Sequence, residues 1–489
     1  MATKGRQIAP SSAQGWTLAL ASVASFMVVL DALVVATALS TIRRDLGASI
    51  EQLEWTVNAY TLSFAVLLMT ASALGDRFGR RRLFSAGLGL FAAASAACAL
   101  APSVSWLIAA RAVQGAGAAM VMPLALALLN AAFPPQRRGW AMGIFGGVTG
   151  LAALVGPVLG GAITQGIAWP WIFWLNVPVG AVAIPLVFGR IRESYGPRSV
   201  LDFPGLGLGT CAALGLVWGL VRANSAGWGS PEVVGALVAG ALLAVAFVAW
   251  EMRARAPMLP MRLFRSRAFS AGNAAIFFLN ASLTGALFFM AQFQQITLGQ
   301  GPLDAGLRLL PWGIAPFLIA PRAGALADRI GERPLIITGL LLQTAGMAWI
   351  ALIATPGVAY ATMIAPMVIS GCGFAIAIPA VTKAVVSSVE QGDIGKASGA
   401  FSTMRQLGGA FGVAILVAVF AAAGSYASGH AFSHGFAPAI GVSAGLSLAG
   451  AVAGLALPRR RVPAGSAPAH AVPALETQAP GLEYVANDG

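Results

Sequence analysis

Two ionisable residues, Asp31 and Arg111, lie deep within long apolar segments of this sequence. Each is about eight residues or fewer from the end of its segment, or about 12 Å at 1.5 Å per residue, so the two lie at a similar depth. Such residues usually face a cavity and a partner of opposite charge. Burial favours the neutral acid and a nearby guanidinium favours its anion, so a ligand entering the cavity can release a proton. The pair therefore predicts a proton-coupling site; the alternative is a static ion pair that joins two helices.

A third charged residue, Arg405, lies inside another apolar segment. It either binds a ligand, or extends to the end of its segment, or pairs with backbone carbonyls. Amide and aromatic side chains within such segments are typical of an apolar pocket for an amphipathic ligand, although single phenylalanines also face lipid. The residues predicted to line this cavity are Asn58, Gln114, Asn280, Gln295, Phe288 and Arg405.

A glycine-rich loop with clustered charges follows the second apolar segment. Arginines and glycines are typical of a tight, positively charged turn at a membrane surface, but that explanation does not account for Asp76. An acid here can bond to helix-end amides or to an arginine of a facing half, and so hold one conformation. The residues predicted to form this gating loop are Gly75, Asp76, Arg77, Gly79 and Arg80.

The fifth apolar segment combines a proline with small residues: Gly156, Pro157, Gly160 and Gly161. Small residues allow membrane helices to pack closely, and proline removes a backbone donor. One interpretation is ordinary helix packing. The other is a bend, or a tightly packed seam between two halves of the molecule.

Membrane-spanning helices are expected to position these residues. Of the 489 residues, 58% are hydrophobic and 10% are charged, whereas a soluble domain has about 25% charged residues. Continuous apolar runs of about 20 residues match the length of a membrane helix, and they exclude a β-barrel, which needs an alternating pattern. The fourteen predicted spans are 16–39, 54–74, 83–101, 104–130, 140–163, 171–189, 203–221, 233–250, 271–297, 305–326, 335–353, 358–382, 398–423 and 438–457.

The basic residues indicate the orientation of these spans. An even number of spans places both ends of the chain on one side, and 24 of the 30 basic residues then fall in loops on that side. Positively charged loops are typical of the cytoplasmic side. The net charge of +13 therefore indicates membrane orientation and not nucleic-acid binding. We expect a multi-pass protein of the bacterial inner membrane with both termini in the cytoplasm.

The sequence also contains an internal repeat. Residues 74–79, after the second span, are similar to residues 326–331, after the tenth. Repeated six-helix halves with a binding site at their interface are typical of secondary transporters. The predicted organisation is a cytoplasmic tail at 1–15, a six-helix bundle at 16–189, two linker helices and a cytoplasmic loop at 190–267, a second six-helix bundle at 268–457, and a disordered cytoplasmic tail at 458–489.

Other classes of function lack the residues that they need. The sequence has no Walker A motif for ATP. His430 and His434 have no nearby acid or cysteine, so they do not predict a metal site. An intramembrane enzyme needs clustered His, Asp, Ser or Cys at one depth, and a receptor or channel does not explain the repeat. We therefore expect no enzymatic activity, no cofactor and no bound metal.

The chain resembles the major facilitator superfamily, and within it the fourteen-helix drug:proton antiporters (EmrB/QacA-like), over nearly all of residues 16–457. Segments 76–81, 111–117 and 156–161 are similar to the family motifs after helix 2, in helix 4 and in helix 5. The segments at 30–31, 171–178 and 404–409 also resemble this family. The sequence departs from the usual pattern at Ser72, Ala152 and Pro170.

This resemblance implies an all-α major facilitator fold with two six-helix bundles and two extra central helices. It implies export of small lipophilic drugs or metabolites in exchange for protons by alternating access. Asp31 and Arg111 would then couple protons, Asp76 and Arg80 would gate, and Gly156 would belong to the antiporter helix. The expected partners are a small-molecule substrate, protons and the lipid bilayer, without nucleic acid, and the expected state is a monomer. The alternative is a proton-coupled symporter that imports a nutrient or siderophore, against which the helix 5 motif argues.

Overall fold

The computed structural model describes residues 12–196, 202–390 and 393–458, and within these ranges the secondary structure is helical, without strands. Both predicted tails therefore lie almost entirely outside the described residues. The helices are α1 (Ser12–Leu46), α2 (Ile50–Phe78), α3 (Arg80–Ala99), α4 (Val104–Ala132), α5 (Pro135–Gly166), α6 (Trp171–Trp174), α7 (Asn176–Arg190), α8 (Phe203–Ala226), α9 (Pro231–Arg253), η1 (Met261–Arg265), α10 (Arg267–Gln292), η2 (Phe293–Thr297), α11 (Pro302–Arg308), α12 (Leu310–Ile330), α13 (Glu332–Ile353), α14 (Tyr360–Val386), α15 (Ile394–Ala423) and α16 (Gly429–Leu455).

The all-helical membrane fold expected from the sequence is confirmed. Thirteen described helical segments are long and apolar enough to cross a membrane. The 21-residue helix α12 takes the place of the predicted span 305–326, after the short helix α11. Fourteen long helical segments thus account for the fourteen predicted spans.

Two helix boundaries change the depth of functional residues. Helix α1 continues to Leu46 instead of ending near residue 39, so Asp31 lies near the middle of its helix. Helix α2 begins at Ile50 instead of residue 54, because Ser49 and Gln52 form a reciprocal capping box. Glu54 therefore lies inside the second turn of α2 and not at its start.

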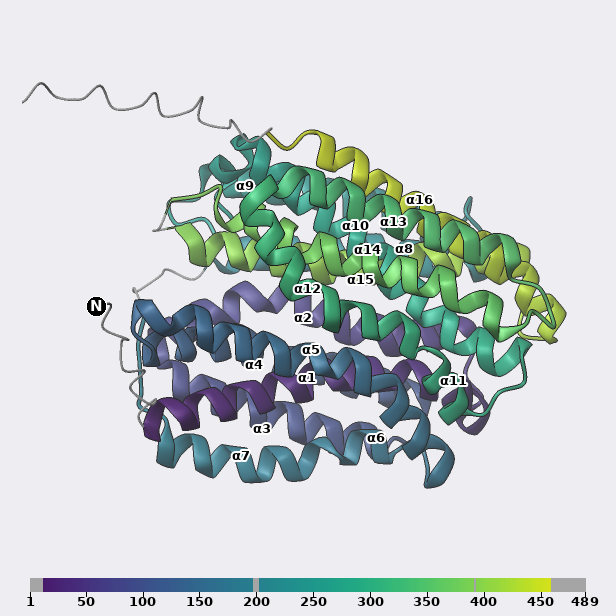
Figure 1. Ribbon diagram of the computed structural model, residues 1–489, viewed down its shortest axis with the longest axis horizontal. Coiled ribbons are helices and arrows are strands. Elements are labelled where there is room, and N and C mark those ends of the chain that lie inside the picture. The colour runs from purple at the N-terminus through teal and green to yellow at the C-terminus, as the bar shows by residue number, and fades with distance from the viewer. Residues whose placement is uncertain (1–11, 197–201, 391–392, 459–489) are drawn as a thin grey trace, which may run out of the picture.

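The helices pack in two groups with a pair of helices beside them. In Figure 1, α1, α3, α4 and α7 lie together on one side of the molecule, and α13, α14 and α16 lie on the other. Helices α8 and α9 pack mainly against each other, and α8 also contacts α2 and α15. The two groups meet mainly between α2 and α15 and between α5 and α11, with smaller contacts of α5 with α12 and of α1 with α10 and α11. Residues on α2, α5, α10 and α15 are therefore placed to face across the molecule.

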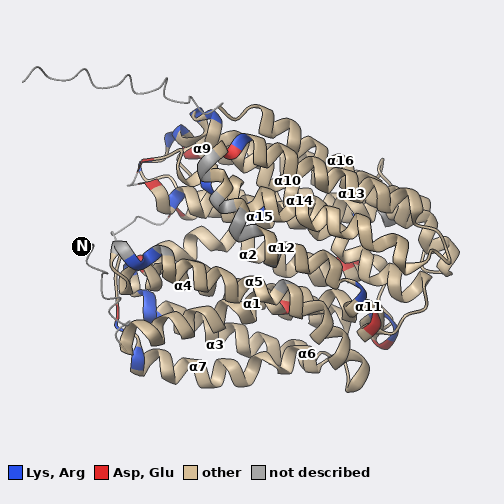
Figure 2. Ribbon diagram, in the orientation of Figure 1, with Lys and Arg blue, Asp and Glu red and all other residues tan. Residues whose placement is uncertain are grey.

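The charged residues lie mainly at the ends of the helices. Figure 2 shows most lysines and arginines at the end of the molecule where the N-terminus is marked, with a smaller charged group near α11 at the other end. The length of the bundle between the two ends is almost entirely uncharged. The few charged residues within it are therefore the natural candidates for function.

Candidate functional site

Asp31 and Arg111 are brought together by the packing of α1 against α4. Nη1 of Arg111 donates a hydrogen bond to Oδ2 of Asp31, and the pair is an ion pair. Each residue is only 1% exposed. The two apolar segments therefore place their only internal charges face to face, and neither charge is turned toward lipid.

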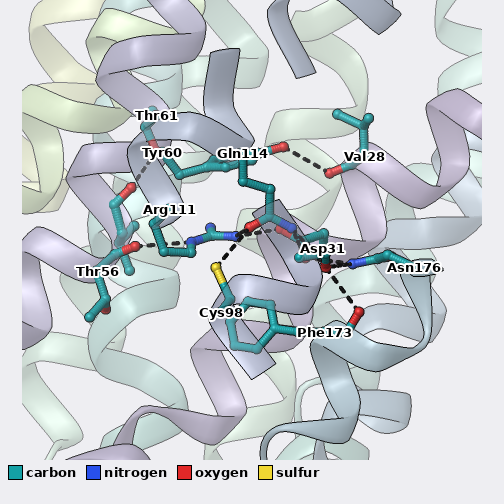
Figure 3. A network of polar contacts seen from close by, with 12 residues as sticks. Val28, Asp31, Thr56, Tyr60, Thr61, Cys98, Arg111, Gln114, Phe173 and Asn176 are labelled. Carbon is teal, nitrogen blue, oxygen red and sulfur yellow. Dashed lines mark hydrogen bonds and ion pairs between the residues drawn. The ribbon is translucent and has the colours of Figure 1, made fainter. Parts of the chain in front are cut away.

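Two amide side chains complete the surroundings of the Asp31 carboxylate, as Figure 3 shows. Its Oδ1 atom accepts hydrogen bonds from Nε2 of Gln114 at 2.9 Å and from Nδ2 of Asn176 at 2.8 Å. Both amides also donate to Oγ of Ser95, which in turn donates to a backbone carbonyl of α6. Every acceptor atom of the carboxylate therefore has a donor, as a buried anion requires.

The guanidinium of Arg111 is held by a second set of contacts. Nη1 also donates to Oε1 of Gln114 at 2.7 Å, and Nε donates to the carbonyl of Thr56 at 3.1 Å. Its Cζ atom lies 4.1 Å from the ring centre of Tyr60, whose hydroxyl donates to the carbonyl of Val28. Carbonyl, amide and ring face all stabilise a cation. The charges are thus fixed by residues from α1, α2, α3, α4 and α7.

This network lies wholly within the first group of helices. The side chains of Asp31, Arg111, Gln114, Asn176 and Ser95 are all 1% exposed or less. Gln114, which the sequence assigned to the substrate cavity, therefore lies beside the ion pair and apart from the amides of α10. The ion pair and its polar partners are therefore shielded from bulk solvent in this conformation.

Two members of the network were not predicted as site residues, although Asn176 belongs to the family-like segment 171–178. Asn176 follows an aromatic run at the junction of α6 and α7, and Ser95 is one of many small residues of α3. Neither type is rare in a membrane helix. Such a residue can be assigned as a partner of Asp31 only when the helices that pack against α1 are known.

A second buried acid was missed, because the sequence indicated Asp31 as the only carboxylate deep within a span. Glu54 is 0% exposed, and its Oε1 atom accepts only a long hydrogen bond, 3.4 Å, from Nδ2 of Asn58. Its Oε2 atom is buried without a partner among the described residues. The Ser49–Gln52 capping box was the available signal, since it places Glu54 one turn inside α2.

The other predicted cavity residues lie at separate places along the two groups of helices. Nδ2 of Asn280 donates to the carbonyl of Arg405 at 2.8 Å, which joins α10 to α15. Nε2 of Gln295 donates to the carbonyl of Thr37 at 2.9 Å, which joins η2 to α1. Phe288 is 2% exposed and makes an edge contact with the neighbouring phenylalanine. Asn58 contacts Glu54 and not these residues.

The predicted gating loop forms its contacts within the first group of helices. Oδ1 of Asp76 accepts a hydrogen bond from Nε of Arg80 at 2.8 Å, and the two residues form an ion pair. Gly79 has a φ of 110°, a region that favours glycine. Glu193, after α7, accepts hydrogen bonds from the backbone amides at the start of α3. Asp76 thus bonds to an arginine of its own loop, and its carbonyl accepts from the amide of Gly196.

The other two predicted loop residues have simpler surroundings. A methyl group at Gly75 would lie 2.2 Å from Cδ2 of Leu124, so α2 and α4 approach closely at this point. The guanidinium of Arg77 lies 5.4 Å from the ring centre of Phe78. Gly75 therefore allows close helix packing, while Arg77 is an exposed residue at the helix end.

The small residues of α5 lie against two different helices. Methyl groups at Gly156 and Gly160 would lie 2.8 Å or less from atoms of α1. A methyl group at Gly161 would lie 2.2 Å from the carbonyl oxygen of Pro302 in α11, and the carbonyl of Pro157 lies against Gly306 of the same helix. Both suggestions from the sequence therefore apply at once: close packing, and a seam between the two groups of helices.

The described residues contain no group of three or more His, Cys, Asp or Glu side chains placed to hold a metal ion. His430 and His434, which the sequence placed in a loop, lie instead in the first turns of α16.

Comparison with known proteins agrees with this architecture. The family described as Major Facilitator Superfamily matches residues 21–413, most of the chain. The chain belongs to the Major Facilitator Superfamily. It is therefore a membrane transporter and not an enzyme.

Several relatives are named for antibiotic resistance or export. The chain is 35% identical over 404 residues to the tetracenomycin C resistance and export protein of Streptomyces glaucescens, covering 82% of this chain and 74% of that one. It is 36% identical over 425 residues to the cephamycin export protein of Amycolatopsis lactamdurans, covering 85% and 87%. The puromycin resistance protein of Streptomyces alboniger is 35% identical over 415 residues, covering 83% and 82%.

Solved structures share the fold at low sequence identity. A crystal structure of a POT family transporter with a thioalcohol-conjugated peptide has a TM-score of 0.67 and 16% identity, covering 89% of this chain and 94% of that one. At this identity the likeness shows the fold alone.

Proposed function

We propose that the protein is a secondary active transporter that exports small lipophilic drugs or metabolites in exchange for protons by alternating access. The buried network around Asp31 is the observation that carries this proposal. The three relatives compared above support export of small molecules, because their names describe antibiotic resistance or export.

The Asp31 carboxylate carries the exchanged proton. As an anion it accepts bonds from Arg111, Gln114 and Asn176. A proton on Oδ1, which already accepts two hydrogen bonds, leaves room for only one of them, so the bond to Gln114 or to Asn176 must break. Because these donors belong to α4 and α7, taking up a proton at this atom changes the packing of one of these helices against α1.

Helix α1 connects this change to the seam between the two groups of helices. Asp31 lies on one face of α1, while Leu33 and Val34 lie against Gly156 and Gly160 of α5. Helix α5 in turn contacts α11 through Gly161. A small shift of α1 is therefore transmitted to the contact that α5 makes with the opposite group.

The contacts across the molecule support a conformation that is closed at the end opposite the N-terminus. Helices α5 and α11 touch there, Gln295 bonds to α1, and the guanidinium of Arg43 lies 4.3 Å from the ring centre of Tyr426. Glycines of the other half of α5, such as Gly143 and Gly150, would meet nothing within 4 Å. Opening the α5–α11 seam while closing the other end is the proposed transport step.

The remaining parts of the proposal concern the cavity and the membrane. Asn58, Asn280, Gln295, Phe288 and Arg405 contribute to substrate binding. The charged end at which α1 begins faces the cytoplasm of a bacterial cell, as positively charged ends usually do. The protein works as a monomer in this scheme.

Transport by purified protein in liposomes tests the proposal. A growth screen of a drug-sensitive bacterial host first selects a substrate, and an imposed pH gradient then drives its movement. We expect substrate to leave the compartment that protons enter, and Asp31→Asn to bind substrate but lose gradient-driven transport. Asp45→Asn, an exposed acid on the same helix, is the matched control and should transport normally. Undiminished gradient-driven export by Asp31→Asn would refute the role of this acid, and substrate movement along with protons would indicate a symporter.

A further inference from the structure

The structure contains one deep cation without a carboxylate partner among the described residues. Arg405 lies 11 residues after the start of α15, which is about 16 Å at 1.5 Å per residue. None of the described ion pairs includes it. Its Nε atom is buried, and no described residue supplies a hydrogen-bond partner for it. By contrast, Nε and Nη1 of Arg111 both donate hydrogen bonds to protein atoms.

The structural explanations for Arg405 do not account for this environment. The inner end of α15 is farther away than an arginine side chain can extend, so its charge does not reach the membrane surface. No described hydrogen bond joins its guanidinium to a backbone carbonyl; only its own carbonyl accepts, from Asn280. A permanently charged group kept at this depth is expected to serve a polar ligand or pathway.

The face of α15 that carries Arg405 points between the two groups of helices. Gly409 is one turn further along the same face. A methyl group there would lie 3.1 Å from Nδ2 of Asn280, 3.3 Å from Oγ1 of Thr284 and 3.5 Å from Cγ2 of Thr61. The first two belong to α10 and the third to α2, from the opposite group. The other face of α15, with Phe411, packs against α8.

We propose that Arg405 binds the carboxylate of a lipophilic acid as this compound passes through the transporter. A guanidinium presents a planar fork of donors that matches a carboxylate with two parallel hydrogen bonds. Asn280 and Thr284 supply further polar contacts beside it, and Phe277, whose carbonyl lies against Gly408, supplies an apolar surface for the body of the ligand. This inference rests on the proposed export of lipophilic compounds and adds the class of substrate.

Binding of a fluorescent lipophilic acid and its uncharged ester tests this assignment. The probes are dansyl-undecanoic acid and its methyl ester, added to the full-length protein in detergent. We expect the wild-type protein to bind the acid more tightly than the ester by about tenfold or more, the size of one charge-assisted pair. Arg405→Gln should lose this preference and keep its affinity for the ester, which also shows that the variant is folded. Arg405→Lys should retain part of the preference, because it keeps the charge and loses the fork.

Arg44→Gln, at an exposed end of α1, is the control for a general loss of positive charge and should bind both probes as the wild-type protein does. The proposal is overturned if the wild-type protein does not prefer the acid, or if Arg405→Gln weakens both probes equally. Binding is measured without a pH gradient, so its result does not depend on proton coupling. If the wild-type protein prefers the acid but shows no gradient-driven export in liposomes, the proposed proton coupling is refuted and the Arg405 subsite is still supported.

Discussion

Neutral substitutions of Asp31 and Arg111 are expected to have strongly non-additive effects on stability. Arg111→Gln removes the guanidinium that donates to Asp31, Gln114 and the carbonyl of Thr56. It leaves an acid that is 1% exposed with amide donors only. Removing one partner of a buried ion pair costs about 3–5 kcal/mol, because the other charge remains uncompensated.

The complementary substitution and the double variant define the coupling. Asp31→Asn keeps a side-chain oxygen that accepts from Arg111, so its expected cost is smaller, about 1–3 kcal/mol. In the double variant no charge remains, and the expected loss is about that of Arg111→Gln alone. The coupling free energy between the two positions is then about 1–3 kcal/mol.

Unfolding in mixtures of dodecyl maltoside and sodium dodecyl sulfate measures this quantity through the fluorescence of the 12 tryptophans. The matched control is the pair Arg44→Gln and Asp45→Asn, two exposed residues at the end of α1 whose effects should add. If the losses at Asp31 and Arg111 also add within about 0.5 kcal/mol, the two charges do not act as one unit and the reasoning is wrong.

Three further predictions concern the seam, the second buried acid and the start of α3. Gly161→Val should lower transport by about tenfold or more, because even a methyl group there would lie 2.2 Å from a carbonyl oxygen of α11. Gly235→Val, in open space on α9, should transport normally, and equal losses in the two variants would contradict a seam. Glu54→Gln should keep or raise the free energy of unfolding by up to about 1 kcal/mol, because it removes a buried carboxylate oxygen without a partner among the described residues. The control Glu51→Gln breaks a partly exposed ion pair and should lower the free energy of unfolding by less than about 1 kcal/mol. A clear loss of stability in Glu54→Gln would contradict the absence of a partner. Glu193→Gln should lower stability in a thermal unfolding assay by about 1 kcal/mol, since its carboxylate accepts from the first amides of α3; an unchanged midpoint would exclude this capping role.

The fold was predictable because lipid imposes a simple rule on the chain. Every backbone group in a membrane must be bonded internally, so each long apolar run has to become a helix. The fourteen predicted spans follow from that rule. The helix ends were less predictable, because polar residues occur both in the last turn of a membrane helix and in the loop that follows it. Helix α1 thus continues through Arg43 and Arg44, beyond its predicted end, and the early start of α2 changed the position of Glu54.

The pairing of Asp31 with Arg111 was predictable for a related reason. Two opposite charges at the same depth in an apolar medium are expected to pair, because pairing lowers the free-energy cost of burying each of them. The partners of that pair were not predictable in the same way. Neutral amides and hydroxyls are common in membrane helices, and the roles of Gln114, Asn176 and Ser95 depend on which helices pack together.

By itself, the sequence determined an all-helical membrane protein with an internal repeat and one pair of opposite charges buried within apolar helices. Hydrophobicity and charge are properties of each residue, so their effects do not depend on how the helices pack against one another. Only the tertiary structure decided that Gln114 serves the ion pair, that Asp76 bonds within its own loop and that Arg405 has no carboxylate partner among the described residues. Those outcomes depend on distances of a few ångströms between helices far apart in the chain, and the packing of whole helical faces sets such distances.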